Sequence, residues 1–174
     1  MFGCIGKTYW WALGFMIMQS AAEYYEDLRV GQTFKSGLGR TVLEEDNVWF
    51  SLLTLNTNQI HFNLEYAQKH YSDPPFDGRL IVNGVFTLGL VIGLSVSSMG
   101  VNGVMLGLED VRFVRPVFAG DTIYAEVEVA EMRESTSRRG FGVVKLRTRG
   151  YNQRGETVVE FVRVVLVPMR SQGR

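Results

Sequence analysis

The chain has 174 residues and a mass of 19.7 kDa, which suits one domain able to bury about two-thirds of the surface that its unfolded form would expose. Eighteen basic residues balance eighteen acidic ones, so no global charge excess draws nucleic acid or an anionic membrane surface. The single cysteine, Cys4, excludes an internal disulfide framework and a cysteine-rich zinc site and is typical of a reducing compartment. We therefore expect a cytoplasmic location.

The first 23 residues differ in composition from the rest of the chain. Thr8 to Ala22 is a mostly apolar stretch of fifteen residues, fewer than the ~20 that a membrane-spanning helix needs. Lys7 before it and small residues at its end resemble a weak signal peptide. We expect residues 1–23 to be an N-terminal extension whose apolar side chains pack on the domain or on a neighbouring subunit; a signal or membrane-associated segment is the alternative.

One continuous unit follows this extension. From Tyr24 onward no linker, low-complexity segment or internal repeat interrupts the chain, so we expect a single domain over residues 24–170 and a polar tail at residues 171–174. Thr33 to Val42 contains two glycines, which is weak for a strand but compatible with a bent one.

Two helices are predicted next along the chain. Thr41, with two glutamates close behind it, predicts a capped start for a helix over about Glu44 to Leu55, which carries a broad apolar face. A shorter helix is expected over Leu64 to His70. The pair Pro74 and Pro75 ends this segment because proline cannot continue the hydrogen-bond ladder of a helix.

The stretch from Gly84 to Met99 contains no charged residue, and its apolar residues surround the helical wheel. This pattern predicts a helix that is buried on all sides. Gly89 and Gly93 permit close approach by another backbone, although each lowers helical propensity by ~1 kcal/mol. The run is too short to span a membrane comfortably.

Four strand-like runs follow, joined by turns rich in glycine, asparagine and aspartate. They are Val104 to Val117, Thr122 to Glu134, Phe141 to Tyr151 and Glu156 to Val167. In the second run apolar residues alternate with polar ones, the period-two pattern of a sheet with one buried face. The chain is therefore predicted to form an α+β fold, an antiparallel sheet wrapped around the apolar helix, whose edges favour pairing with a second copy.

A polar loop between the two early helices holds the strongest candidate site. Leu55 to Asn63 reads LNTNQIHFN and contains His61, one of only two histidines, together with Asn56 and Asn58. These side chains form a cluster of hydrogen-bonding groups at loop spacing, where a reacting carbonyl or a water molecule could be held.

Four segments of the sequence together resemble a known family. They read YYEDLRVGQTF, NTNQIHFNLEYA, GRLIVNGVFTLGL and FVRPVFAGDTIYAEVEV, in that order along the chain. The resemblance covers roughly Tyr24 to Pro168 and points to the MaoC-type dehydratases, also called R-specific enoyl-CoA hydratases. It implies a single hotdog domain, addition of water to a 2-enoyl thioester with coenzyme A as carrier and no permanently bound cofactor, and commonly a homodimer.

The same resemblance assigns roles by position. His61 matches the catalytic histidine of the family, Asn58 the asparagine of its motif, and Gly84 the glycine whose backbone N–H polarises the thioester carbonyl. Asn56 stands where the family has a catalytic aspartate, and Asn83 where a histidine often precedes the glycine. The motif's usual proline is also absent, since glutamine stands at position 59. The asparagine at position 56 is the most serious departure.

Hydration needs a base for the water, an acid for the α carbon and donors for the charge on the thioester oxygen. Asn56 can orient water but cannot accept its proton. We favour His61 acting alone as both base and acid; a substitute carboxylate such as Asp77, Glu65 or Asp46 is the alternative. The Gly84 N–H begins a helix and suits an oxyanion, although a simple helix cap is the competing interpretation.

We expect Asn58, Asn83 and Arg79 to contact the substrate. Arg79, together with Arg112 and Arg115, could also hold a second carboxylate on the acyl group, which favours a dicarboxylic thioester such as a mesaconyl, itaconyl or methylmalyl one. The competing interpretation is that these arginines are solvated on a sheet. A further basic row on one strand could meet the phosphates of coenzyme A, or form an exposed face; its members are Lys145, Arg147 and Arg149.

Other chemistries find little support in the sequence. A serine-hydrolase elbow is missing, and the two histidines, His61 and His70, lack metal-ligand spacing, so we expect no metal site. The leading hypothesis is a homodimeric hydratase or dehydratase of acyl-CoA thioesters. The alternatives are a hotdog thioesterase and a non-catalytic subunit that binds thioesters or has a structural role.

Overall fold

The fold is described by a computed structural model that covers residues 22–99 and 103–170. Most of the predicted N-terminal extension and the predicted tail at residues 171–174 lie outside the described residues. Within the described ranges, no helix is both long enough and apolar enough to cross a membrane.

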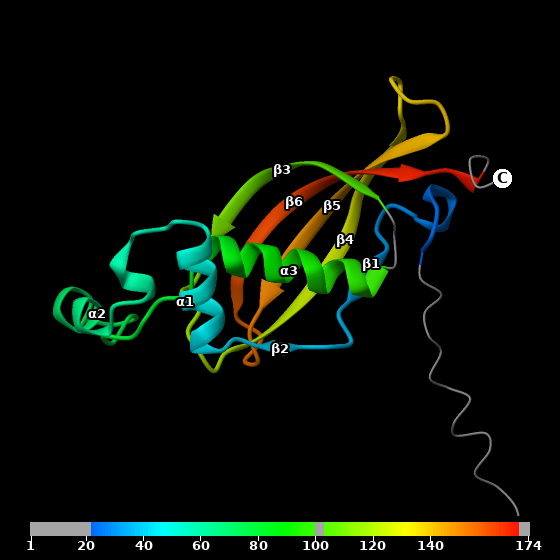
Figure 1. The fold of residues 1–174 in the computed structure, drawn as a ribbon. Coiled ribbons are helices and arrows are strands. Elements are labelled where there is room, and N and C mark those ends of the chain that lie inside the picture. Colours follow the sequence, from blue (N-terminus) through cyan, green and yellow to red (C-terminus); the bar gives the residue numbers. More distant parts are fainter. Residues whose placement is uncertain (1–21, 100–102, 171–174) are drawn as a thin grey trace, which may run out of the picture.

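A six-stranded antiparallel sheet forms the larger layer of the fold (Figure 1). Three long strands lie at its centre and follow one another as hairpins, and the sheet order is β1-β4-β5-β6-β3, with β2 also paired to β4. The strands are β1 (Thr33–Lys35), β2 (Arg40–Thr41), β3 (Val104–Phe113), β4 (Thr122–Glu134), β5 (Phe141–Tyr151) and β6 (Thr157–Pro168).

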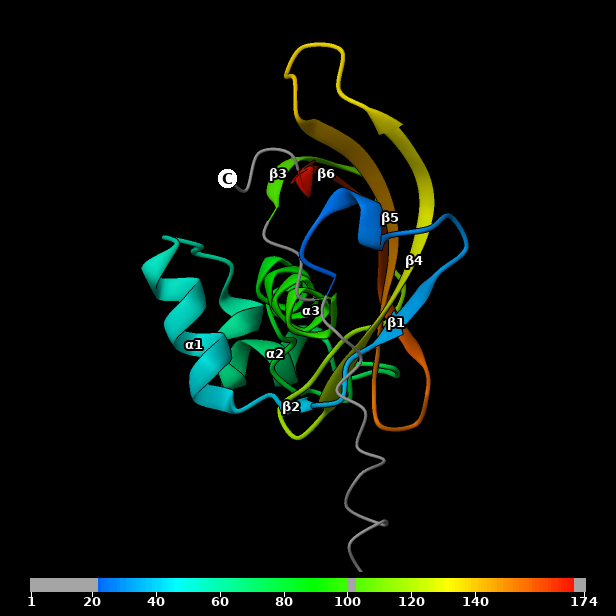
Figure 2. The same cartoon turned by 90° about the vertical axis from the view of Figure 1, so that its right-hand side faces the viewer.

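The predicted period-two pattern is confirmed in β4. Ile123, Ala125, Val127 and Val129 are fully buried, and the residues between them are only partly buried. Helix α3 (Gly84–Met99) lies across the inner face of the sheet, and Figure 2 shows the strands curving around one side of it. The prediction of an antiparallel sheet wrapped around an apolar helix is therefore correct.

The sheet and α3 approach closely at one glycine. A Cβ atom added to Gly150 on β5 would lie 2.4 Å from a methyl group of Val91, which is fully buried on α3. Glycine at position 150 therefore allows α3 to pack closely against the sheet.

The prediction that α3 is buried on all sides is wrong. Val85 and Val96 are 60% and 43% exposed, and Gly89 and Gly93 between them are also exposed. The physical reason is that a single sheet covers only one side of a helix. Within the described residues, the apolar stripe on the other side has no covering layer.

Four shorter helices precede α3, two of them 3-10 helices. They are η1 (Tyr25–Asp27), α1 (Glu44–Leu53), η2 (Gln59–His61) and α2 (Leu64–His70). Helix α1 begins at the predicted residue, but its cap differs from the predicted one. Leu43 is the N-cap, and its N–H donates to the Asp46 carboxylate at 2.8 Å, whereas the Thr41 hydroxyl contacts Thr122 on β4.

Helix α1 also faces in an unexpected direction. Its only buried side chains are the polar Asn47 and Ser51, one turn apart, whereas Trp49, Leu52 and Leu53 are exposed. The apolar face that the sequence pattern emphasised therefore points outward, and a polar pair faces the rest of the domain.

Candidate active site

The His61 side chain is held in one orientation by a backbone carbonyl. His61 ends the short helix η2, and its Nδ1 atom lies 2.8 Å from the carbonyl oxygen of Ile81. A carbonyl can only accept, so Nδ1 carries the hydrogen and donates it. In the neutral ring the other nitrogen, Nε2, is then unprotonated and able to accept a proton. This arrangement equips the imidazole to act as a base.

His61 and Gly84 line the same cavity, which has a volume of about 240 Å³ and is called the His61 cavity below. Its apolar wall consists of Phe76, Ile81, Val82, Phe113, Val114, Pro116, Val117 and Val158. Thr87 and Arg115 supply the remaining polar groups, and no carboxylate is among its described lining residues. The imidazole and the start of α3 therefore converge on one mostly apolar space.

Gly84 presents a free backbone donor at the start of α3. The preceding residue, Asn83, caps the helix, because its side-chain oxygen accepts from the N–H of Val85 at 3.0 Å. The Gly84 N–H itself has no acceptor among the described residues, as expected for the first turn of a helix. A Cβ atom at position 84 would lie 3.0 Å from the Phe113 ring, so glycine is also the residue that fits here.

The buried side chain of Asn47 ties these parts together. Its Nδ2 donates to the carbonyl oxygens of His61 at 2.8 Å and Ile81 at 3.1 Å, and its Oδ1 accepts from the N–H of Asn83 at 2.8 Å. Asn83 in turn donates from its side chain to the Ser51 hydroxyl at 3.3 Å. One asparagine thus fixes both the histidine loop and the start of α3. Sequence reasoning missed it, although two polar residues at i and i+4 on an apolar helix are a signal.

Three predicted asparagines are placed in other hydrogen bonds. The Asn56 side chain accepts from the N–H of Asn58 at 3.0 Å, and the Asn58 side chain accepts from the N–H of Ile60 at 3.4 Å. Asn83 is buried within the helix cap. None of the three lines the His61 cavity, so the structure brings together only His61 and Gly84 of the predicted catalytic residues.

The carboxylates proposed as substitutes for the aspartate also lie away from this cavity. Asp46 pairs with Arg40 through two 2.9 Å contacts, and Asp77 pairs with Arg79 at 3.4 Å. Glu65 is exposed on α2. None of these acidic residues lines the His61 cavity.

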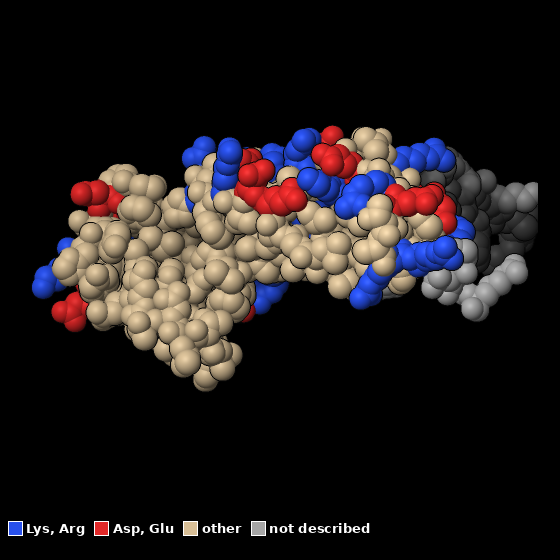
Figure 3. Space-filling model, turned by 90° about the horizontal axis from the view of Figure 1, so that it is seen from above, with Lys and Arg blue, Asp and Glu red and all other residues tan. Residues whose placement is uncertain are grey.

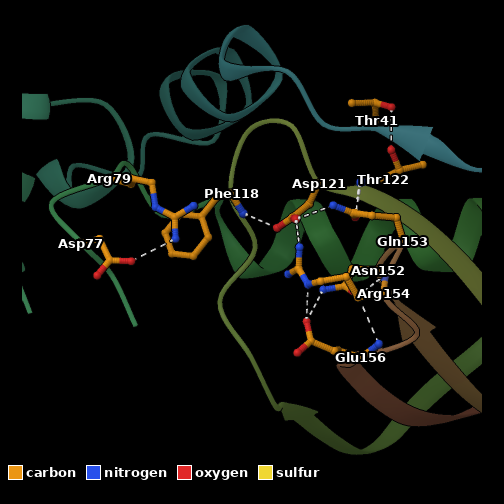
Figure 4. A network of polar contacts seen from close by, with 10 residues as sticks. All are labelled: Thr41, Asp77, Arg79, Phe118, Asp121, Thr122, Asn152, Gln153, Arg154 and Glu156. Carbon is orange, nitrogen blue, oxygen red and sulfur yellow. Dashed lines mark hydrogen bonds and ion pairs between the residues drawn. The ribbon is translucent and has the colours of Figure 1, made fainter. Parts of the chain in front are cut away.

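A larger and more polar cavity of about 480 Å³ adjoins the first; it is called the polar cavity below. The two cavities share Val114, Arg115 and Pro116 as lining residues, just beyond the end of β3. Figure 4 shows a hydrogen-bonded network on the wall of the polar cavity. Its members are Asp121, Asn152, Gln153, Arg154 and Glu156.

The carboxylates of this network are already engaged. Asp121 accepts from the N–H of Phe118 at 3.1 Å and contacts Arg154 at 3.6 Å. Hydrogen bonds from the side chains of Asn152 and then Arg154 lower the pKa of Glu156. Both acids are thus engaged within the network, and neither lines the His61 cavity.

The three candidate arginines have different surroundings. The Arg79 guanidinium lies 3.6 Å from the centre of the Phe118 ring and pairs with Asp77 (Figure 4), and Arg79 lines the polar cavity. Arg112 lies 3.9 Å from Glu160. Arg115 lines both cavities and forms no ion pair with a described residue. Among the three, only Arg115 lines the His61 cavity, and its charge also contributes to the lowered pKa of Glu156.

The basic row on β5 is matched by acids on β3 and β4. Lys145 pairs with Glu109 at 3.0 Å, Arg147 with Glu128 at 2.9 Å, and Arg149 with Glu126 at 2.7 Å. Figure 3 shows charges of both signs interleaved along one side of the molecule, beside a large uncharged area. This row is an exposed ion-paired face, the second of the two interpretations that the sequence left open. Across the described residues, no cluster of three or more potential metal ligands occurs.

Comparison with known proteins identifies the family. The protein-family model described as MaoC like domain matches residues 26–151, so the chain belongs to this family. A conserved hypothetical protein from Mycobacterium tuberculosis with a double hotdog fold superposes with a TM-score of 0.74 at 21% identity, over 85% of this chain and 44% of that one. The predicted hotdog fold is therefore confirmed.

Two relatives in this family carry names that describe reactions. A mesaconyl-CoA hydratase of Cereibacter sphaeroides is 33% identical over 154 residues, which are 87% of this chain and 43% of that protein. An (R)-specific enoyl-CoA hydratase of Rhodospirillum rubrum is 30% identical over 148 residues, 85% of this chain and 94% of that protein. The chain thus spans less than half the length of the first relative and nearly all of the second.

The role of Asn47 can be tested by its removal. Asn47→Ala removes the partner of the Asn83 N–H and of the His61 carbonyl and one of the two donors to the Ile81 carbonyl, so we expect the free energy of unfolding to fall by about 2–4 kcal/mol in urea. Ser51→Ala, one turn away and equally buried, loses a single long hydrogen bond and should lose only about 0.5–1.5 kcal/mol. Equal losses in the two variants would contradict the central position of Asn47.

Proposed function

We propose that the protein is a hydratase or dehydratase that adds or removes water across the 2,3 double bond of an acyl-CoA thioester. The observation that carries this proposal is the convergence of the His61 imidazole and the unpaired Gly84 N–H on one apolar cavity. Coenzyme A enters as part of the substrate, and the reaction as proposed needs no further cofactor. The names of the relatives support the same class of reaction.

In this proposal the Gly84 N–H serves as the oxyanion donor. When water attacks the β carbon of an enoyl thioester, the electrons of the double bond move toward the thioester oxygen, which becomes negatively charged. A preorganised N–H at a helix start stabilises this charge, and the apolar surroundings strengthen the interaction. The Phe113 ring beside Gly84 helps to keep this environment dry.

His61 supplies the proton transfers on the same substrate. Its Nε2 accepts a proton from water as the water oxygen bonds to the β carbon. When the enolate collapses, the same proton passes from Nε2 to the α carbon, so the elements of water are added and His61 returns to its starting state. The hydrogen bond from Nδ1 to Ile81 stabilises the imidazolium that forms between the two steps.

A mechanism with one imidazole is supported by the composition of the cavity wall. The described lining residues include no carboxylate, and Asn56 occupies the aspartate position without lining the cavity. We therefore assign both acid and base roles to His61. Asn56 and Asn58 act as positioning residues, because their side chains cap the backbone of the loop that carries His61.

Arg115 gives a reason to propose a dicarboxylic acyl group. Arg115 lines both cavities and has no ion pair among the described residues. A second carboxylate on a short acyl chain, as in a mesaconyl group, would find a bidentate partner there. Arg79, by contrast, is stacked on Phe118 and paired with Asp77. We assign it to a contact with the part of the thioester beyond the acyl group.

We also propose that the active form is a homodimer located in the cytoplasm. The exposed apolar stripe of α3 and the edge strand β3, with exposed Val104, Met105 and Leu106, need a covering layer. Both surfaces are free of charge over Gly84–Met99 and Val104–Leu108, so a second copy meets no repulsion. The single cysteine suits a reducing compartment.

Replacement of His61 tests the chemistry. In a crotonyl-CoA assay that follows loss of enone absorbance, His61→Ala should lower the rate of hydration by about 10²- to 10⁴-fold, the range for a general acid–base residue. The exposed His70, changed to alanine, is the matched control and should retain activity.

The same assay separates the alternatives. Undiminished hydration by His61→Ala would exclude the proposed role of this residue. Release of free thiol by the unaltered protein in place of enone loss would indicate a thioesterase, and thioester binding without either change would indicate a non-catalytic subunit.

The choice of acyl group is tested at Arg115. Arg115→Ala should lower kcat/KM for mesaconyl-CoA by about 10- to 100-fold, because a hydrogen bond to a charged group contributes ~1.5–3 kcal/mol, and should leave crotonyl-CoA nearly unaffected. Arg112→Ala removes a nearby arginine that pairs with Glu160 and should not change the ratio of the two substrates. A proportional loss for both substrates in Arg115→Ala would argue against recognition of a second carboxylate.

The dimer is tested by sedimentation. A Cβ added to Gly89 on α3 meets no described atom within 4 Å in the single chain, so Gly89→Glu should fold but obstruct pairing across the helix stripe. We expect the unaltered protein to sediment as a dimer and Gly89→Glu as a monomer. Gly37→Glu, which places the same side chain at an equally open loop position, should remain dimeric. A monomeric unaltered protein would contradict the proposal.

A further inference from the structure

Arg163 on β6 occupies a place usually filled by an apolar side chain. It lies on the inner face of the sheet in the same alternation as Phe161 and Val165, and its backbone is opposite Leu146 on β5 and Leu108 on β3. Only 5% of Arg163 is exposed. A guanidinium is therefore placed inside the layer between the sheet and α3.

The buried guanidinium has no counter-ion among the described residues. Its Nε atom has no hydrogen-bond acceptor, and its Nη2 atom has only a weak contact of 3.9 Å with the sulfur of Met99. Burial lowers the pKa of Arg163, and no neighbouring carboxylate offsets this effect. An unpaired buried charge is unfavourable, and among the described residues this strong donor lacks an acceptor.

Arg163 lines a cavity of about 150 Å³ between α3 and the start of β3, called the Arg163 cavity below. Buried Met99, Leu146 and Val165 form its inner part. Val96 and Met105, which are half-exposed in the single chain and belong to the surfaces covered in the proposed dimer, form its rim. Except for Arg163, the described lining residues carry no charge. The cavity therefore combines an apolar lining with one cationic group.

This cavity is separate from the His61 cavity. The two share no lining residue, and they lie toward opposite ends of α3, with Gly84 at one and Met99 at the other. At 1.5 Å per residue this helix is on the order of 22 Å long, far more than a short acyl group can span. A ligand beside Arg163 is thus not the acyl group of a thioester held at Gly84 in the same chain.

We propose that the Arg163 cavity binds a free short-chain carboxylate of about four carbons. The guanidinium accepts the carboxylate as a planar, bidentate pair, and the apolar chain fills the space among the Val96, Met99 and Leu146 side chains. An apolar cavity of about 150 Å³ accommodates benzene, which has six non-hydrogen atoms, and butyrate has the same number. This site does not depend on the reaction proposed at His61.

Calorimetric titration of the full chain with sodium butyrate tests the proposal. We expect one butyrate per chain and at least ten-fold weaker binding by Arg163→Met, which keeps an apolar side chain of similar length but removes the charge. Val96→Phe keeps the guanidinium and narrows the rim, and it should also weaken binding at least ten-fold. n-Butylammonium, with the same apolar chain and the opposite charge, should not bind.

Two results would overturn the proposal. The first is the absence of butyrate binding to the unaltered protein; weaker self-association of Arg163→Met would then assign the missing acceptor to a second copy. The second is equal binding of butyrate by the unaltered protein and both variants. His61→Ala should bind butyrate normally, so a failure of the catalytic proposal would leave this result unchanged.

Discussion

The backbone carbonyl of Ile81 is the acceptor on which the candidate site depends. It receives hydrogen bonds from both the His61 ring and the Asn47 side chain, and Asn47 also holds the N–H of Asn83 just before α3. These contacts join three segments that are far apart in the sequence. Through them, the orientation of the imidazole and the position of the first free N–H of α3 are set by the same buried asparagine.

The surroundings of this junction favour a reaction that builds up negative charge. The wall of the His61 cavity is mostly apolar, so the Gly84 N–H acts in a medium of low polarity, where hydrogen bonds to a developing anion are strong. In the proposed reaction Arg115, which lines this cavity, recognises the substrate and does not enter the proton transfers. Binding and chemistry are thus assigned to different residues.

Local patterns were sufficient to predict much of this structure. The alternation in β4, the charge-free run of α3 and the sequence around His61 are short-range signals, and each led to the correct element or to a residue of the cavity. The direction in which α1 faces was not predictable from its apolar residues. Its buried partner, Asn83, lies 36 residues beyond Asn47, and a helical wheel contains no information about such a contact.

The exposed side of α3 shows a second limit of sequence patterns. A helical wheel does not distinguish an apolar residue that packs against the sheet from one that is exposed. Buried Val91 and exposed Val85 therefore could not be told apart from the sequence. Arg163 is a related case. In the sequence it is one of two charged residues in a mostly apolar strand, and only the packing reveals that its charge is enclosed and has no ion pair among the described residues.

Nuclear magnetic resonance can test directly whether one thioester meets both groups. Butyryl-CoA is saturated and cannot be hydrated, so the bound state persists during a titration. The account predicts that the Gly84 amide proton moves strongly downfield as the thioester oxygen accepts its hydrogen bond, and that the His61 Nε2 resonance shifts with the same binding curve. Saturable binding that leaves both resonances unchanged would contradict the account.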